Sequence, residues 1–359
     1  MPSVPQPPVL TADDIGRTCL VTGGSGYLGR ALVRRLLDAG CTVRTLDVQK
    51  QGPDPRATHH VADLRDPGAI AKAFAGVDTV FHTAAIISVV GEDLAPPALR
   101  RFVYGVNVVG TENVVRAARA AGVTAFVHTS SFNVVMDRPI RDGDESLSYA
   151  AGAFDLYSVT KIASERIALA ADAKDGMRVA AIRPGGIWGS GRGAMMIDAF
   201  VEQLAKGAFV ASIGDGNALL DNTHVENVVD AELLAARALR TRPETVGGRA
   251  YFVTDDDRFD GTEWFRPLVE GLGHRYPSAK IPAKVAMAIG LAGEVAHKLG
   301  APTPTLTRRA VKNLTEGATF RIDRARADLG YEPRYGREHL VDLLPELKPV
   351  HDRLRGGKS

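Results

Sequence analysis

The sequence has few cysteines, little net charge and no strongly basic segment. Its 359 residues include only Cys19 and Cys41, which excludes a disulfide scaffold and a cysteine-only zinc site and is typical of a reducing cytoplasm. The net charge of +2 at pH 7 gives no sign of a nucleic-acid partner. The first residues, MPSVPQPPVL, lack the charged start and apolar core of a signal peptide. We therefore expect a cytoplasmic protein.

The first half of the sequence alternates between strand-like and helix-like segments. Apolar runs separated by helical patterns predict strands at 18–22, 42–47, 59–63, 78–85, 125–131 and 178–184. Between the first two runs, Leu28, Leu32 and Leu36 share one helical face, and the helix ends at Gly40. Because crossovers between parallel strands are right-handed, this alternation predicts a Rossmann-like, doubly wound parallel sheet with helices on both faces.

The pattern loosens after about residue 190, where a smaller and mostly helical lobe is expected. Ligands of such sheets bind at the carboxyl ends of the strands, so this lobe would close over them. The expected organisation is a flexible tail over 1–12, a dinucleotide-binding domain over 13–190 with 225–255, a substrate-binding lobe over 191–224 with 256–345, and a C-terminal tail over 346–359.

The segment TGGSGYLG, residues 22–29, joins the first strand to the first long helix. Glycine at 23, 26 and 29 lets the backbone approach a ligand closely, and the amides and dipole of a helix N-terminus favour a pyrophosphate. Asp47 ends the next strand, where a carboxylate can accept hydrogen bonds from a ribose 2′-hydroxyl and repel a 2′-phosphate. This arrangement predicts NAD, while nearby basic residues leave NADP open. Asp63, at another strand end, would lie near the adenine or else cap the helix that begins at Pro67.

The segment LYSVTK places Tyr157 and Lys161 one turn apart on the same face of a predicted helix. A tyrosine has an ordinary pKa of about 10, and a nearby ammonium group favours its ionised form. The positively charged ring of NAD⁺ would act in the same direction. The hydroxyl groups of HTSSF, at the end of the 125–131 strand, can hydrogen-bond a substrate oxygen as charge develops on it.

Seven segments resemble, in order, those of extended short-chain dehydrogenases/reductases: TGGSGYLG, DL at 63–64, HTAA at 82–85, NVVGTENV at 107–114, HTSS, YSVTK and RPGGIWG at 183–189. The resemblance implies that Tyr157 transfers a proton, Lys161 holds the ribose and tunes the tyrosine, and Ser131 orients the reacting oxygen. Asn107 would steady the active-site helix and a water. Together, the glycine turn and this resemblance give the expected cofactor-binding residues Gly23, Ser25, Gly26, Tyr27, Leu28, Gly29, Asp47, Asp63, Leu64, Thr83, Ala84, Ala85, Asn107, Lys161, Pro184 and Ile187.

Further segments, among them HTAAIIS, LDNTHVENVVDAELLAARAL and FRIDRARADLGYEPRY, resemble the 3β-hydroxysteroid dehydrogenase/isomerase branch. That branch implies NAD-dependent oxidation of a steroid or sterol 3β-hydroxyl to the 3-ketone, with Δ5 to Δ4 isomerisation as a further step whose acid and base the sequence does not assign. The alternatives are a sterol-4-carboxylate 3-dehydrogenase, an NDP-sugar epimerase or dehydratase, and a non-enzymatic dinucleotide sensor. The family commonly dimerises, and the helices around 98–121 and 155–172 carry enough apolar surface for a homodimer.

An apolar stripe runs along the predicted helix at 281–299 and includes Ile281, Val285, Ile289, Ala292, Val295 and Leu299. The charges and two internal glycines of this helix exclude a good transmembrane span. Three interpretations stay open: a helix packed on the core, a lid over an apolar ligand, and peripheral docking on a membrane. A steroid is mostly carbon, and its burial returns roughly 25 cal/mol per Å².

The remaining basic residues suggest no further site. We interpret three histidines near strand ends or loops as packed or hydrogen-bonded, and their spacing does not indicate a metal site; they are His82, His128 and His224. We interpret two basic pairs as solvated surface, namely Arg34–Arg35 and Arg308–Arg309.

Replacing Tyr157 with phenylalanine should abolish turnover, because the phenol oxygen carries the proton in the expected mechanism. Binding of NAD⁺ should stay almost intact, since the ring would keep its place. Steady-state kinetics and NAD⁺ binding measured on Tyr157→Phe check this expectation. Turnover close to that of the wild type would remove the mechanism.

Overall fold

A seven-stranded parallel sheet forms the centre of the molecule. The computed structural model describes residues 4–356, except 89, 90, 154, 192, 262, 303 and 305. The strand order is β12-β7-β5-β4-β1-β2-β3, and every neighbouring pair is parallel. The strands are β1 (Thr18–Thr22), β2 (Thr42–Asp47), β3 (Thr58–Val61), β4 (Thr79–His82), β5 (Ala125–Thr129), β7 (Arg178–Pro184) and β12 (Arg249–Val253). The predicted doubly wound sheet is confirmed.

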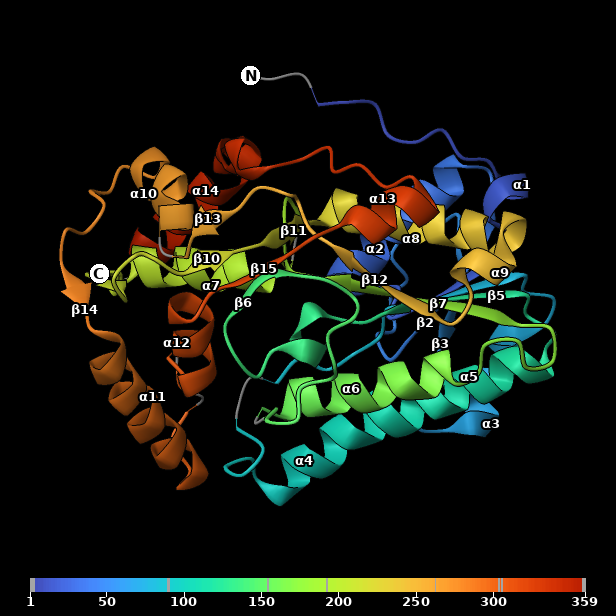
Figure 1. Cartoon of the computed structure of the whole chain (residues 1–359), viewed down its shortest axis with the longest axis horizontal. Coiled ribbons are helices and arrows are strands. Elements are labelled where there is room, and N and C mark those ends of the chain that lie inside the picture. The colour runs from blue at the N-terminus through green and yellow to red at the C-terminus, as the bar shows by residue number, and fades with distance from the viewer. Residues whose placement is uncertain are drawn as a thin grey trace.

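Helices cover both faces of this sheet (Figure 1). On one face lie α1 (Ala12–Ile15), α2 (Tyr27–Asp38), α8 (Val225–Thr241), α9 (Pro243–Val246) and α13 (Asp323–Leu329). On the other lie α3 (Pro67–Ile70), α4 (Pro97–Tyr104), α5 (Gly110–Ala120) and α6 (Leu156–Leu169), with the 3₁₀ turn Ala71–Phe74. A π-helical turn, Gly105–Val109, joins α4 to α5.

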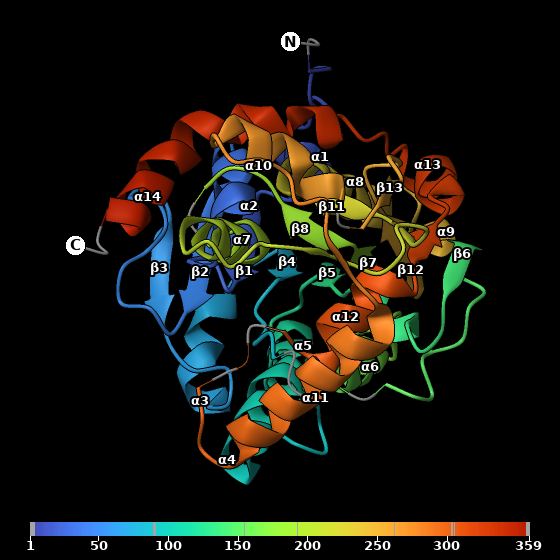
Figure 2. The ribbon, with the colours of Figure 1, turned by 90° about the vertical axis from the view of Figure 1, so that its left-hand side faces the viewer.

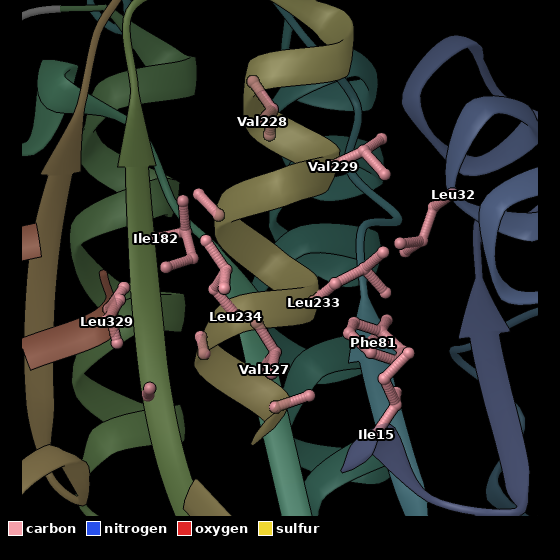
Figure 3. Packing of buried hydrophobic residues seen from close by; sticks show 14 of the residues in the cluster. Ile15, Leu32, Phe81, Val127, Ile182, Val228, Val229, Leu233, Leu234 and Leu329 are labelled. Atoms are coloured by element: carbon pink, nitrogen blue, oxygen red, sulfur yellow. The ribbon is translucent and has the colours of Figure 1, made fainter. Parts of the chain in front are cut away.

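The largest apolar core lies between the sheet and helices α2 and α8. Figure 3 shows α8 directing Leu233 and Leu234 toward the strands, with Leu32 of α2 beside it. The side chain of Leu234 is only 3% exposed. This core packs α2 and α8 against the face of the sheet opposite to the one that α5 and α6 cover. The ends of the strands therefore lie between these two layers of helices.

The remaining elements form a smaller part of the molecule, seen at the left of Figure 1. A separate apolar core that includes Trp188 and Trp264 packs many of them together. The helices are α7 (Met195–Ala205), α10 (Arg266–Gly271), α11 (Ala283–Lys298), α12 (Arg308–Thr315) and α14 (Leu344–Gly356), with the 3₁₀ turns η3 (Phe132–Val135), η4 (Glu263–Phe265) and η5 (Arg337–Leu343). The short strands are β6 (Ile140–Gly143), β8 (Gly186–Trp188), β9 (Ser212–Ile213), β10 (Leu219–Leu220), β11 (Asn222–His224), β13 (Phe259–Asp260), β14 (Lys280–Ile281) and β15 (Ala318–Phe320).

The end of the chain differs from the tail expected over 346–359. Residues Leu344–Gly356 form helix α14, which packs against α7. Leu347 and His351, four positions apart and therefore on one helical face, are both buried. Their burial explains why this segment is ordered as a helix. Residues 1–3 and 357–359 of the two expected tails lie outside the described residues.

The apolar stripe of α11 points outward instead of into the core. Its side chains are 41–84% exposed at Val285, Ile289, Val295 and Leu299. The buried side of α11 carries Gly290 and Glu294, and a Cβ at Gly290 would lie 2.9 Å from the backbone nitrogen of Arg308 on α12. The core-packed interpretation of the stripe is therefore wrong, whereas the lid and the membrane surface stay predictions. In the described part of the chain, no helix has the length and apolar character needed to cross a membrane.

Truncation of a core leucine on α8 should destabilise the fold. We expect Leu234→Ala to lower the free energy of unfolding by about 2–5 kcal/mol, because a buried cavity replaces the lost methyl groups. Leu299→Ala is the matched control, since that side chain is 84% exposed and its loss should change stability by about 0.5 kcal/mol or less. Denaturant unfolding compares the two variants, and equal losses would contradict this account of the core.

Candidate active site

The site lies where the direction of strand addition reverses. From β1 the chain adds β2 and β3 on one side, and β4, β5, β7 and β12 on the other. Crevices at such a switch point, outside the carboxyl ends of the strands, are the usual ligand sites of open α/β sheets. Here the glycine turn follows β1 and residues 83–85 follow β4, and the last residues of these strands, Thr22 and His82, are register partners.

The glycine turn forms a cradle that packs at backbone distance against itself and against the loop after β4. Gly23 has a φ of +68°, and a Cβ there would lie 2.8 Å from the Cα of Ala84. A Cβ at Gly29 would lie only 2.2 Å from the carbonyl oxygen of Gly23. Gly26 is the N-cap of α2, and no side chain caps this helix. The uncapped N-terminus behind a close-packed glycine turn fits a pyrophosphate.

Asp47 is held at the edge of this cradle by two backbone amides. Its carboxylate oxygens accept hydrogen bonds from the amides of Ser25 and Gln49, both at 3.0 Å. A carboxylate has about four lone-pair sites, so it keeps acceptor capacity for a ribose hydroxyl. Helix α2 begins with Tyr27 and Leu28. Leu28 is buried in the core, and Tyr27 packs against that core. Their side chains face the fold, which leaves their backbone amides to serve a ligand.

The structure does not use Asp63 as a helix cap. Its carboxylate pairs with the guanidinium of Arg65 at 2.5 Å, while Asp66 caps α3 by accepting from the amides of Gly68 and Ala69. The capping alternative for Asp63 is therefore wrong, and its place near an adenine stays a prediction. Leu64 is buried in the core on the α5 side of the sheet.

Asn107 links the loop after β4 to the helix that carries Tyr157. Its side-chain amide donates to the carbonyl of Ile86 and to the hydroxyl of Thr160 on α6, both at 3.0 Å. Its side-chain oxygen accepts from the amide of Ile86 at 2.7 Å. Asn107 sits in the π-helical turn, a feature frequent at functional sites. These bonds support the steadying role that the family resemblance implies.

Tyr157 and Ser131 meet at the carboxyl end of β5. Tyr157 is half-buried in the first turn of α6, and its phenol lies near enough to the Ser131 side chain for that side chain to affect its pKa. Ser131 accepts from the amide of Asn133 at 3.2 Å. Burial raises the pKa of the Tyr157 phenol to about 12 against the lowering effect of Ser131. The phenol is therefore protonated at neutral pH in this structure.

Lys161 lies one turn further along α6 and is buried at 3% exposure. Its ammonium donates to the carbonyl oxygen of Thr129 at 2.6 Å. Burial lowers the pKa of Lys161 to about 8, although Glu165 and Glu232 raise it. Burial, Ser131, Asp155 and Arg309 act on the pKa of Tyr157, and the expected lowering of that pKa by the Lys161 ammonium stays a prediction.

Sequence reasoning missed two buried carboxylates around Lys161. Glu232 of α8 accepts a hydrogen bond from the Thr129 hydroxyl, and burial raises the pKa of its carboxyl to about 7. Glu165 of α6 forms a buried ion pair with Arg183 at 2.6 Å. The spacing of Lys161 and Glu165, one helical turn, was readable from the sequence, whereas Glu232 lies 103 residues from its partner Thr129.

The expectation that the two basic pairs are solvated surface is confirmed for Arg34, which is 55% exposed, and is wrong for Arg35, Arg308 and Arg309, which are partly or fully buried. Arg34 and Arg35 pair with Glu226 and so connect α2 to α8. Arg308 pairs with the buried Glu294 of α11 at 2.8 Å. Arg309 is only 4% exposed and binds Asp155, which is 1% exposed, at 2.5 Å. One signal for Asp155 was available, since an aspartate directly before a helix is a typical N-cap.

The three histidines are packed or hydrogen-bonded, as expected. His82 bridges the hydroxyls of Thr22 and Thr111 at 2.7 and 2.9 Å, and burial lowers its pKa to about 3. His224 accepts from the amide of Glu226. His128 is buried with its ring 5.4 Å from that of His82. Within the described ranges, no group of three or more His, Cys, Asp or Glu side chains could hold a metal.

The two residues expected beside a nicotinamide lie at the exit of β7. Pro184 ends this strand, buried beside Val253 of β12. Ile187 belongs to β8, where it is the register partner of Thr223. Thr83, directly after β4, donates to the carbonyl of Thr22 at 2.8 Å. Their contacts with a cofactor stay predictions.

Closing the glycine cradle should weaken dinucleotide binding. We expect Gly29→Ala to reduce NAD⁺ affinity by on the order of tenfold or more, about 1.4 kcal/mol, because the new Cβ would force the carbonyl of Gly23 to move. Gly68→Ala is the matched control, since a Cβ there meets its nearest atom at 3.4 Å. Isothermal titration calorimetry measures both, and unchanged affinity in Gly29→Ala would contradict the assignment of the cradle.

Solved structures share this fold over nearly the whole chain. UDP-glucose 4-epimerase from Thermotoga maritima, solved with UDP-glucose, has a TM-score of 0.68 at 20% identity and covers 95% of this chain and 100% of that one. MoeE5, solved with UDP-glucose and NAD, has a TM-score of 0.67 at 26% identity and covers 94% of this chain and 99% of that one.

Sequence relatives identify the family. A 3 beta-hydroxysteroid dehydrogenase/Delta 5-->4-isomerase of Mycobacterium tuberculosis is 38% identical, covering 95% of this chain and 93% of the relative. A 3-beta-hydroxysteroid dehydrogenase of Mycolicibacterium neoaurum is also 38% identical, covering 95% and 94%. A mouse sterol-4-alpha-carboxylate 3-dehydrogenase, decarboxylating, is 33% identical, covering 91% and 89%. The model of the 3-beta hydroxysteroid dehydrogenase/isomerase family matches residues 20–283, and the chain belongs to that family.

Proposed function

We propose that the protein catalyses the NAD-dependent oxidation of the 3β-hydroxyl group of a steroid or sterol to the 3-ketone. The observation that carries the proposal is the placement of Tyr157 near enough to Ser131, at the end of β5, for the serine to lower the pKa of the phenol, in a chain whose relatives named as 3β-hydroxysteroid dehydrogenases match it over 95% of its length. Isomerisation of a 5-ene product to the conjugated 4-ene ketone is a further proposed step.

The chemistry assigns one task to each side chain. NAD⁺, when bound, accepts the hydride that leaves C3 of the substrate. Tyr157 accepts the proton of the 3β-hydroxyl, and Ser131 donates a hydrogen bond to the oxygen as negative charge develops there. Lys161 supplies a positive charge one turn from the phenol and would bind the ribose. Because burial raises the pKa of Tyr157 to about 12, positive charge in the site is needed to form the phenolate at neutral pH.

The cofactor assignment rests on the glycine cradle and on Asp47. The fixed carboxylate of Asp47 favours a free 2′-hydroxyl, since a 2′-phosphate would bring like charges together. We therefore propose NAD in preference to NADP. Asp63, Leu64, Thr83, Ala84 and Ala85 are proposed to line the adenosine and the middle of the dinucleotide, and Asn107, Pro184 and Ile187 to surround its nicotinamide end.

An apolar substrate is favoured by the surface of α11. Its exposed stripe has no role in the core, and the stripe is available to cover a ligand or to contact a membrane surface from which a sterol is taken. A nucleotide sugar would instead call for arginines that face its phosphates. We also propose a homodimer formed through α4–α5 and α6, because Phe102 and Val109 on this face are 41% and 47% exposed.

One panel of assays separates the candidate functions. We expect NADH formation with a 3β-hydroxy-5-ene steroid of the pregnenolone or androstene type, measured in parallel with NAD⁺ and NADP⁺. Ultraviolet absorbance of a conjugated enone would report the isomerisation step. A 4-carboxysterol and a series of UDP-sugars test the two enzymatic alternatives.

The Tyr157→Phe variant is the control for this panel, because it should bind NAD⁺ and fail to form NADH. Turnover of a UDP-sugar without any steroid oxidation would contradict the proposed function. NAD⁺ binding without turnover of any substrate in the panel would favour a dinucleotide sensor.

A further inference from the structure

We propose that Arg309 of α12 is a positioning residue for this reaction, because its guanidinium group joins the segment that carries Ser131 to the segment that carries Tyr157. The inference rests on the function proposed above. Arg309 comes from the smaller part of the molecule, and α12 lies beside α11 near the start of α6 (Figure 2). It therefore makes the catalytic geometry depend on an element outside the Rossmann-like sheet.

On one side, Arg309 holds the first turn of α6. One nitrogen of its guanidinium, Nη1, donates to the carboxylate of Asp155 at 2.5 Å and to the hydroxyl of Ser158 at 3.0 Å. Asp155 is the N-cap of α6, and its other oxygen accepts from the amide of Ser158 at 2.9 Å. Tyr157 lies between these two anchored residues. Its place along and around the helix axis is thus fixed at the point where the chain enters α6.

On the other side, Arg309 holds the turn after β5. Its second terminal nitrogen, Nη2, donates to the side-chain oxygen of Asn133. The backbone amide of Asn133 in turn donates to the hydroxyl oxygen of Ser131 at 3.2 Å. A single planar group thereby bridges the two hydroxyl-bearing residues of the site. Lysine cannot reproduce this bridge, because its ammonium lacks the fixed fork of donors that arginine presents.

A contribution to stability does not by itself explain why the guanidinium group of Arg309 is buried at this point. A buried ion pair pays a desolvation cost that often equals its electrostatic gain, and both Arg309 and Asp155 are almost fully buried. The pair also acts on the phenol. The charge of Arg309 lowers the pKa of Tyr157 and the charge of Asp155 raises it, so the pair balances two opposite effects beside the reacting oxygen.

The neighbouring residue extends the connection to α11. Arg308 donates to both carboxylate oxygens of Glu294, through its backbone amide and its guanidinium, at 2.8 Å. The exposed apolar stripe, α12 and the catalytic pair are therefore joined through consecutive arginines. Through this connection, a ligand that binds α11 would change the position of Tyr157 relative to Ser131.

The test compares Arg309→Met and Arg309→Lys with the matched control Arg334→Lys. Arg334 also forms a buried ion pair, with Asp230 at 2.6 Å and exposures of 8% and 1%, but it contacts neither Ser131 nor Tyr157. We expect kcat for steroid oxidation to fall on the order of 10²-fold in both Arg309 variants, as for a small misplacement of reacting groups. The KM for NAD⁺ should stay within about twofold of the wild type, because the cradle is untouched.

The pH profile of kcat separates positioning from a merely structural role. Three groups act on the phenol besides burial, namely Ser131, Asp155 and Arg309, while Lys161 of the same helix is bonded to Thr129. Arg309→Met leaves the negative charge of Asp155 unbalanced, so the profile should move to higher pH. Asp155→Asn keeps an N-cap residue and leaves the positive charge of Arg309, so the profile should move to lower pH.

A substrate-free measurement keeps this test distinct from that of the proposed function. Hydrogen–deuterium exchange should rise at residues 131–135 and 155–159 in Arg309→Lys, and stay unchanged there in Arg334→Lys. The exchange result does not depend on whether the wild type oxidises a steroid. If the wild type oxidises none, the proposed function is contradicted, but the positioning role of Arg309 is not. If Arg309→Met fails to fold, Asp155→Asn supplies the kinetic arm. Wild-type kcat, an unshifted pH profile and unchanged exchange in the folded variants would overturn the proposal.

Discussion

Parallel pairing of β1, β4, β5 and β7 is the constraint on which the site depends. The register places Thr22 beside His82, His82 beside His128, and Thr129 beside Ile182. Because these strands end at one edge, the glycine turn, residues 83–85 and Ser131 emerge together. The spacing between the glycine cradle and the Tyr157–Ser131 pair proposed to be catalytic is thus set by backbone hydrogen bonds. The sheet fixes where these three segments lie, and contacts between side chains then fix the orientation of each residue.

The second feature of the site is the burial of its ionisable groups. Burial raises the pKa of Tyr157 and lowers that of Lys161, so each group tends toward its neutral form in the absence of further charge. Glu165 and Glu232 oppose this tendency at the lysine, and Arg309 opposes it at the tyrosine. The environment therefore keeps the phenol protonated, and in the proposed mechanism nearby positive charge is needed to make it a base. This reversible balance suits an alcohol–ketone reaction that can run in either direction.

The features that the sequence predicted are those with local signatures. The strand–glycine–helix pattern of 18–29 and the four-residue spacing of Tyr157 and Lys161 need only neighbouring residues to be read. Arg309 was misread as surface because its partner Asp155 lies 154 residues away. The stripe of α11 was open to misreading because periodicity shows that a helix has two faces and not which one packs. The segment 346–359 was expected to be a tail, whereas Leu344–Gly356 form helix α14 with Pro349 inside it.

A crystal structure of the NAD⁺ complex tests the central claim most directly. The account predicts that the phenol oxygen of Tyr157 lies beside the C4 edge of the nicotinamide ring, next to the Ser131 hydroxyl, with the Lys161 ammonium at hydrogen-bond distance from the ribose. A pyrophosphate seated away from the N-terminus of α2, or a Tyr157 oxygen far from C4, would contradict it.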